Sequence, residues 1–145
     1  MKSIAVLGAL ALLVAAIVAP AQAKSPKPKP ASPKPKCVAH AVSYQVSGTL
    51  SAAGALTANS DGTYSGSLTV LVTKTNDHAK TDKHTTRSYA LSNAHVSFGQ
   101  GVSTTAPAAG SRVNLHGTIT TEPKKCGAFA PTITITKAGL RSAKK

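Results

Sequence analysis

Residues 63–75 read TYSGSLTVLVTKT and decide the fold class, because they form the longest uninterrupted strand pattern in the chain. Tyr64, Leu68, Val70 and Val72 fall on one side of an extended chain at a period of two residues, and mostly Ser and Thr fall on the other. Such alternation predicts a β-strand with one face against a core and one face in water. We expect the other folded segments to pair with this strand or pack against it.

Strand patterns of the same kind occur on both sides of this stretch. A long first strand with alternating apolar residues runs from Val38 to Leu50, and Asp61-Gly62 marks a hairpin turn into residues 63–75. The apolar positions of a later strand change phase near Asn93, which indicates a β-bulge. Further strands are predicted over residues 88–98, 112–121 and 132–137, and polar loops over 76–87 and 99–111.

Five main strands, turn signals between them and no convincing helix predict an all-β domain. Short strands with one apolar face must close on themselves or stack as two sheets. The strand count and the long first strand favour a small five-stranded OB-like Greek-key barrel, and a β-sandwich is the alternative. The barrel domain is expected to span residues 37–138, followed by a basic tail over 139–145 that frays.

Three stretches resemble small OB-like β-barrel domains of secreted bacterial proteins. They are YQVSGTL at residues 44–50, the strand over 67–75, and SRVNLHGTI at 111–119. The resemblance covers about 100 residues and lies in β patterning. It implies an OB-like fold and an extracytoplasmic location, and it implies no catalytic residues.

The first 23 residues have the pattern of a secretory signal peptide. A positive start at Lys2 is followed by an aliphatic run from Ile4 to Ala19, and Ala21-Gln22-Ala23 has the small-x-small pattern of a cleavage site. The run is short for a transmembrane helix, so no stable membrane span is expected after processing. An uncleaved N-terminal anchor is the alternative. The protein is therefore predicted to be secreted or extracytoplasmic.

Residues 24–36 read KSPKPKPASPKPK, in which SPKPK occurs twice. Frequent proline excludes helix and sheet, so the segment is expected to be an extended polyproline-II arm rising about 3.1 Å per residue. It is either a solvated spacer or a cationic arm that holds anionic cell-envelope polymer such as cell-wall polymer, lipid headgroups or nucleic acid. In the second interpretation the binding residues are Lys24, Lys27, Lys29, Lys34 and Lys36.

The net charge of +13 is concentrated in the two tails. Between Cys37 and Thr136, seven Lys and Arg residues face four Asp and Glu residues, which leaves a nearly balanced barrel. The chain has no Trp, and its Tyr residues are in phase with the core, so few rings are available to stack on bases. This pattern disfavours nucleic acid as the partner of the barrel.

Cys37 and Cys126 are the only cysteines, and they flank the strand region of a chain with a secretion signal. In an oxidising compartment such a pair is expected to form a disulfide. A reactive thiol is the alternative, but neither cysteine has a second Cys at CxxC spacing.

The polar loop after the central strand holds the one cluster that could bind a metal. Asp77, His78 and His84 share the loop with Asp82, and together they offer carboxylate and imidazole ligands of the kind that zinc, copper or nickel accept. The same loop carries Lys80, Lys83 and Arg87, which favours a solvated surface loop. Of the other histidines, His40 is expected to be partly buried, and His95 and His116 are expected on the surface.

No catalytic constellation is visible in the sequence. Asp61 is assigned to the hairpin turn, and no G-x-S-x-G or S-x-x-K motif occurs. The sequence predicts a secreted or cell-envelope-associated, non-catalytic binding or structural module without a cofactor, held to anionic envelope polymers by its arm. The alternatives are an extracytoplasmic metal-binding or nucleic-acid-binding OB-like protein, and an enzyme of a type without a recognised motif.

Overall fold

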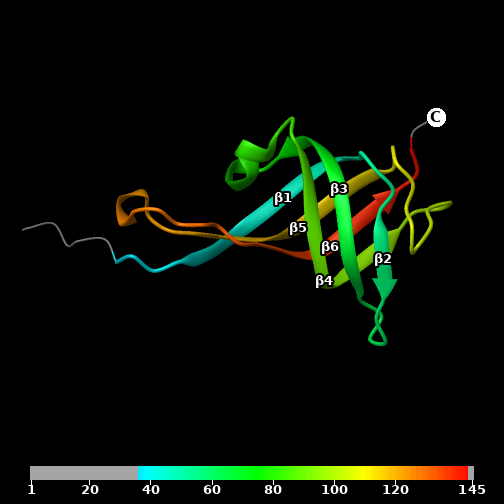
Figure 1. The fold of residues 1–145 in the computed structure, drawn as a ribbon, viewed down its shortest axis with the longest axis horizontal. Coiled ribbons are helices and arrows are strands. Elements are labelled where there is room, and N and C mark those ends of the chain that lie inside the picture. The colour runs from blue at the N-terminus through cyan, green and yellow to red at the C-terminus, as the bar shows by residue number, and fades with distance from the viewer. Residues whose placement is uncertain (1–35, 144–145) are drawn as a thin grey trace, which may run out of the picture. The chain divides into compact units, whose positions relative to one another are not determined.

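Six β-strands and two short 3-10 segments make up the computed structural model, which describes residues 36–143. The predicted signal peptide and all but the last residue of the arm lie outside the described residues. Among residues 36–143, no helix is long and apolar enough to cross a membrane. The strands are β1 (His40–Leu50), β2 (Ala55–Ala58), β3 (Tyr64–Thr75), β4 (Thr86–Phe98), β5 (Arg112–Thr121) and β6 (Ile133–Arg141); the 3-10 segments are η1 (Asp77–Asp82) and η2 (Lys124–Cys126) (Figure 1).

Five of these strands close into a barrel. The neighbours run β1, β5, β6, β4 and β3, and β3 pairs again with β1. All pairs are antiparallel except β4 with β6. The short β2 adds to β3 as a sixth strand. Because the sheet closes with β6 between β4 and β5, the all-β prediction and the OB-like Greek-key barrel are confirmed over the β-sandwich.

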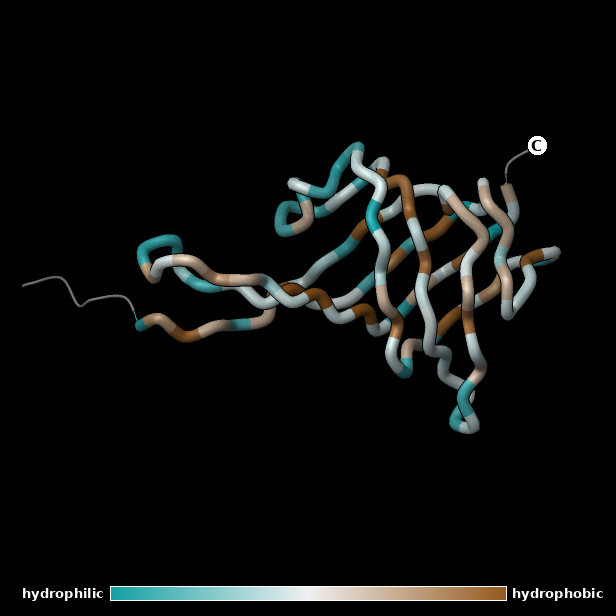
Figure 2. The backbone as a smooth tube through the Cα atoms, in the orientation of Figure 1, coloured by the Kyte–Doolittle hydropathy of each residue, from teal (hydrophilic) through white to brown (hydrophobic). Residues whose placement is uncertain are grey.

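Alternate residues of each strand fill the barrel. On β3, Leu68, Val70 and Val72 have no exposed surface, as the alternation of residues 63–75 predicts. Hydrophilic residues gather at η1 and at the tip of the β2–β3 hairpin (Figure 2). The other strands complete the barrel core with buried side chains, which include Tyr44, Val46, Leu56, Tyr89, Leu91, Val113, Leu115, Ile135 and Leu140.

The predicted hairpin turn joins β2 to β3. The Asn59 amide donates to the Thr63 carbonyl oxygen at 2.8 Å, and Gly62 has a φ of +79° that favours glycine. The Asp61 carboxylate accepts hydrogen bonds from the Thr63 hydroxyl at 2.5 Å and from its amide at 3.0 Å. These bonds lower the pKa of Asp61 below its usual 3.8, and His95 adds a small electrostatic contribution.

Two irregularities bend the strands so that the barrel can close. The pairing of β1 with β3 shifts register between Ser47 and Gly48, where a Cβ at Gly48 would collide with the carbonyl oxygen of Leu71. Asn93 has a φ of 52°, and the pairing of β4 with β6 shifts between Leu91 and His95. The second irregularity confirms the bulge predicted near Asn93.

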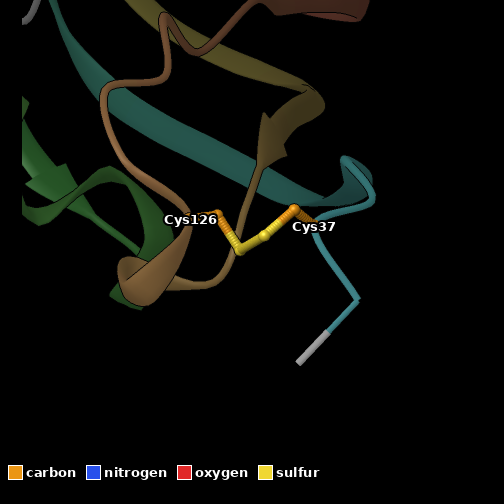
Figure 3. The surroundings of a disulfide bond; sticks show 2 residues. All are labelled: Cys37 and Cys126. Carbon is orange, nitrogen blue, oxygen red and sulfur yellow. A yellow bond between two sulfur atoms is a disulfide. The ribbon is translucent and has the colours of Figure 1, made fainter. Parts of the chain in front are cut away.

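The disulfide between Cys37 and Cys126 is present, as predicted (Figure 3). It joins the segment before β1 to η2 in the β5–β6 connection, and the two Cα atoms lie 5.5 Å apart. The cysteines are 89 residues apart in sequence. In the chain-entropy model, closing a loop of this length stabilises the fold by about 4–5 kcal/mol, which is large beside a modest core.

Three sequence predictions, about the end of β6, the loop that contains η1 and the start of β1, are wrong. The last strand does not end at Lys137, because β6 continues to Arg141 with Leu140 only 1 % exposed, so the barrel extends beyond residue 138. The loop after β3 is not wholly irregular, because η1 folds back on the barrel and buries Ala79. His40 is exposed rather than partly buried, since it lies at the start of β1 outside the barrel core.

Candidate functional site

The predicted metal-binding residues lie on or beside η1. Asp77 forms an exposed ion pair with Lys80 at 2.8 Å, and that lysine lowers the pKa of the Asp77 carboxyl below its usual 3.8. His78 is exposed, and His84 is exposed with a φ of 64°. Within residues 36–143, no group of three or more His, Cys, Asp or Glu side chains is placed to hold a metal ion.

Asp82, which the sequence placed beside the candidate metal ligands, is instead the buried carboxylate of this loop. It is 5 % exposed, accepts a hydrogen bond from the Tyr44 hydroxyl and pairs with the Arg87 guanidinium. The Tyr44 hydroxyl also lies 2.9 Å from that of Tyr89. The two tyrosine rings pack with their centroids 6.2 Å apart. This polar cluster fastens η1 to β1 and β4.

Burial raises the pKa of both tyrosines above the usual value of 10.0. For Tyr44, desolvation is the largest cause, and the hydrogen bond to the Asp82 carboxylate is the next. A hydroxyl that stays neutral is a hydrogen-bond donor at neutral pH. Because Tyr44 has no exposed surface, its hydroxyl can hold the loop in place but is out of reach of a substrate.

A second polar group lies on the outside of the barrel, around a hollow of about 620 Å³ over β4, β5 and β6. We call this hollow the basic trough. Gly139 of β6 lies on its floor, where the lack of a side chain leaves room between the neighbouring strands. Its exposed polar lining consists of His95 and Ser97 from β4, Asn114 and His116 from β5, and Lys137 and Arg141 from β6.

The strand register places these side chains together. Lys137 pairs with His95 on one side and with His116 on the other, so a histidine lies on the neighbouring strand on each side of it. Directly paired residues in a sheet point to the same face. Two residues further along β6, Gly139 pairs with Ser97 and with Asn114. The trough is therefore built across three strands that are distant in sequence.

Positive charge continues past the end of the trough. Arg141 pairs with Arg112 of β5, and a neighbouring hollow of about 320 Å³ is lined by both arginines and by Lys74. Among the described residues that line these two hollows, none is Asp or Glu. Because Lys137 and Arg141 belong to β6, the barrel carries more of the basic charge than the tail assignment predicted.

The sequence predicted that His95 and His116 are exposed, and the structure places both side chains on the surface. It did not predict that they lie on opposite sides of the same lysine. That arrangement depends on the parallel pairing of β4 with β6. For His116 the available signal was alternation, since it lies out of phase with the buried Leu115. His95 and Lys137 are in phase with the buried Leu91 and Ile135, and they reach the outer face because the strand pairing shifts register between these positions.

Of the predicted polymer-binding lysines, only Lys36 is described, and its side chain is exposed. It directly precedes Cys37, so the disulfide fixes the residue next to the arm against η2. Comparisons of the chain with protein-family models, with curated proteins and with solved structures return no match.

Proposed function

We propose that the protein is a secreted or cell-envelope-associated, non-catalytic binding module, held to anionic envelope polymers by its basic arm. The observation that carries the proposal is the sequence of residues 24–36, which contains five lysines and no carboxylate in thirteen residues. A closely spaced series of cations attracts polyanions by releasing their counterions, without any fixed geometry. In this proposal the arm is the anchor, and the barrel is the folded domain that it anchors.

The disulfide supports an extracytoplasmic location for the domain. Cystines persist in oxidising compartments and are rare in the cytosol. The Cys37–Cys126 bond lies beside the end of the arm, so it keeps the arm attached to a closed barrel even when the strand ends open. This agrees with the signal sequence expected over residues 1–23.

Three of the four Asp and Glu residues of the barrel support a non-catalytic role. Asp61 accepts the hydrogen bonds of the hairpin turn, Asp77 pairs with Lys80, and Asp82 is buried against Tyr44. A carboxyl group that takes part in general acid–base chemistry must be within reach of a substrate and free to exchange a proton. These three aspartates are each committed to a structural contact.

The proposal is tested by co-sedimentation with purified bacterial cell walls at low and high salt, using the chain that starts at Lys24. Changing all five arm lysines to Gln should reduce binding at low salt by at least about tenfold, because several polymer contacts are lost together. The matched control changes the same lysines to Arg, which keeps the charge and should keep the binding. High salt should release the wild type.

Equal binding of the Gln and Arg variants would contradict the proposal. In that case the positive charge of the arm is not the anchor, and the barrel recognises the envelope by itself.

A further inference from the structure

The basic trough gives the barrel a feature that the arm does not explain. Its lining brings two histidines, a lysine and an arginine onto one face, although the residues come from three separate strands. Like charges that a fold places side by side repel each other and favour an anionic partner between them. We propose that the basic trough is a second binding site, which takes a linear polyanion without aromatic bases.

The dimensions of the trough suit a chain of anionic groups. Lys137 and Arg141 are four residues apart on β6, which corresponds to about 13 Å along a strand. A single small anion could contact only one of them, whereas a polymer can place successive negative groups near both. Arg112 and Lys74 extend the positive surface into the neighbouring hollow, which gives the polymer a continuous path.

The floor of the trough is open because of Gly139. A Cβ built at Gly139 would meet only the Ser97 hydroxyl oxygen within 4 Å, at 3.5 Å, which is an ordinary contact. A side chain is therefore tolerated here by the backbone, and its absence leaves the hollow between His95 and Asn114 accessible. The same property makes Gly139 a useful place to block the site without disturbing the fold.

The aromatic side chains disfavour nucleic acid as the occupant. Proteins that bind single strands stack bases on exposed rings beside a basic groove. Phe98 is the one Phe, Tyr or Trp among the described residues that line the trough, and it is half-buried. Its ring packs edge-on against Tyr64 at a centroid distance of 5.1 Å. The trough therefore offers charge and hydrogen-bond donors without a stacking platform.

A carboxylate on the β2–β3 hairpin acts on the trough electrostatically. Asp61 interacts weakly with His95, but its oxygens already accept hydrogen bonds from Thr63. It therefore reduces the positive potential at one end of the trough only slightly. The arginine end, at Arg112 and Arg141, has no such neighbour among the residues that line it within the described range.

The inference takes its ligand class from the proposed function, but its site is separate from the arm. The test uses the chain from Lys24 with all five arm lysines changed to Gln, so that only the barrel can bind. Inorganic polyphosphate is the probe, and polygalacturonate is a second probe that distinguishes phosphate from carboxylate polymers. Affinity is measured by titration at several salt concentrations.

In this background, Arg112→Ser with Arg141→Ser should weaken polyphosphate binding roughly tenfold at low salt and reduce its salt dependence. The matched control, Lys83→Ser with Lys125→Ser, removes the same charge away from the trough and should change the affinity less than about twofold. Gly139→Asp should also weaken binding, because it puts a carboxylate on the trough floor while keeping every cation. Circular dichroism verifies that each variant is folded.

The inference is overturned if the arm-neutral parent does not bind either probe, or if the trough and control pairs lose affinity equally. It is also overturned if a single-stranded oligonucleotide of equal charge binds more tightly than both probes. These outcomes do not depend on the cell-wall assay, in which failure of the proposed function shows as equal binding of the Gln and Arg arms.

Discussion

At the scale of single residues, the stability of the β3–β4 connection depends on Asp82. We predict that Asp82→Ala lowers the free energy of unfolding by about 2–3 kcal/mol, because it leaves the buried Tyr44 hydroxyl without its acceptor and Arg87 without its partner. The expected loss is at the low end of what breaking a buried ion pair costs, because the Arg87 side chain is 43 % exposed. Urea unfolding measures the change.

The matched control is Asp77→Ala in the same 3-10 segment. Its ion pair with Lys80 is exposed, so its loss should leave the free energy of unfolding nearly unchanged. If both variants are destabilised equally, the loop depends on its charge as a whole rather than on the buried cluster.

The buried tyrosines predict a loss of stability in alkali. Their pKa values are raised in the folded protein, so they stay protonated when the unfolded chain begins to ionise at the usual 10.0. Their contribution to the free energy of unfolding is therefore complete below pH 10.0, and it is lost as the pH rises above that value. In a phenolate absorbance titration, the folded protein should ionise fewer tyrosines than the urea-unfolded protein near that pH.

The sign of this effect can be checked with Tyr44→Phe and Tyr89→Phe together. The double variant should lose less stability between roughly pH 9 and pH 11 than the wild type, because two titrating groups are gone. An equal loss in both proteins would show that these tyrosines ionise in the folded state.

At the scale of structural elements, the bend of β1 at Gly48 controls barrel closure. We predict that Gly48→Ala lowers the free energy of unfolding by about 1–3 kcal/mol or more, since the new Cβ would collide with the Leu71 carbonyl oxygen. Gly139→Ala is the matched control, because its Cβ would make only an ordinary contact. Thermal unfolding of both variants compares them, and equal melting temperatures would refute the role of the bend.

The strands could be predicted well because their signal is local. Residues 63–75 alternate so regularly that only one face can be buried, and Leu68, Val70 and Val72 do lie in the core. The end of β6 was missed for a local reason as well. The apolar pattern after Ile135 is interrupted by Thr136 and Lys137 at a register shift, so Ala138 and Leu140 no longer continue it.

The candidate site could be predicted only in part because its signal is not local. The exposure of His95 and His116 followed from alternation, but their position on both sides of Lys137 depends on the order β5, β6, β4. The burial of Asp82 was also missed, because it depends on η1 folding back onto Tyr44. Neither pairing leaves a pattern in the sequence.

At the scale of the whole molecule, the positive charge has two locations with different properties. The arm over residues 24–36 holds five lysines close together in sequence. The basic trough holds its cations on three strands of the barrel. Two linked sites on one polymer bind more tightly than either alone, since the second contact forms at a high effective concentration. In the proposed function, the arm and the basic trough therefore bind the same polymer together.

The central claim is tested most directly by measuring polyphosphate affinity for four proteins across a salt series: wild type, arm lysines to Gln, Arg112→Ser with Arg141→Ser, and both sets combined. The account predicts that each set alone weakens binding and flattens its salt dependence, and that the combined protein binds most weakly of the four. Unchanged affinity in the combined protein would contradict the account, because the binding would then not depend on either basic site.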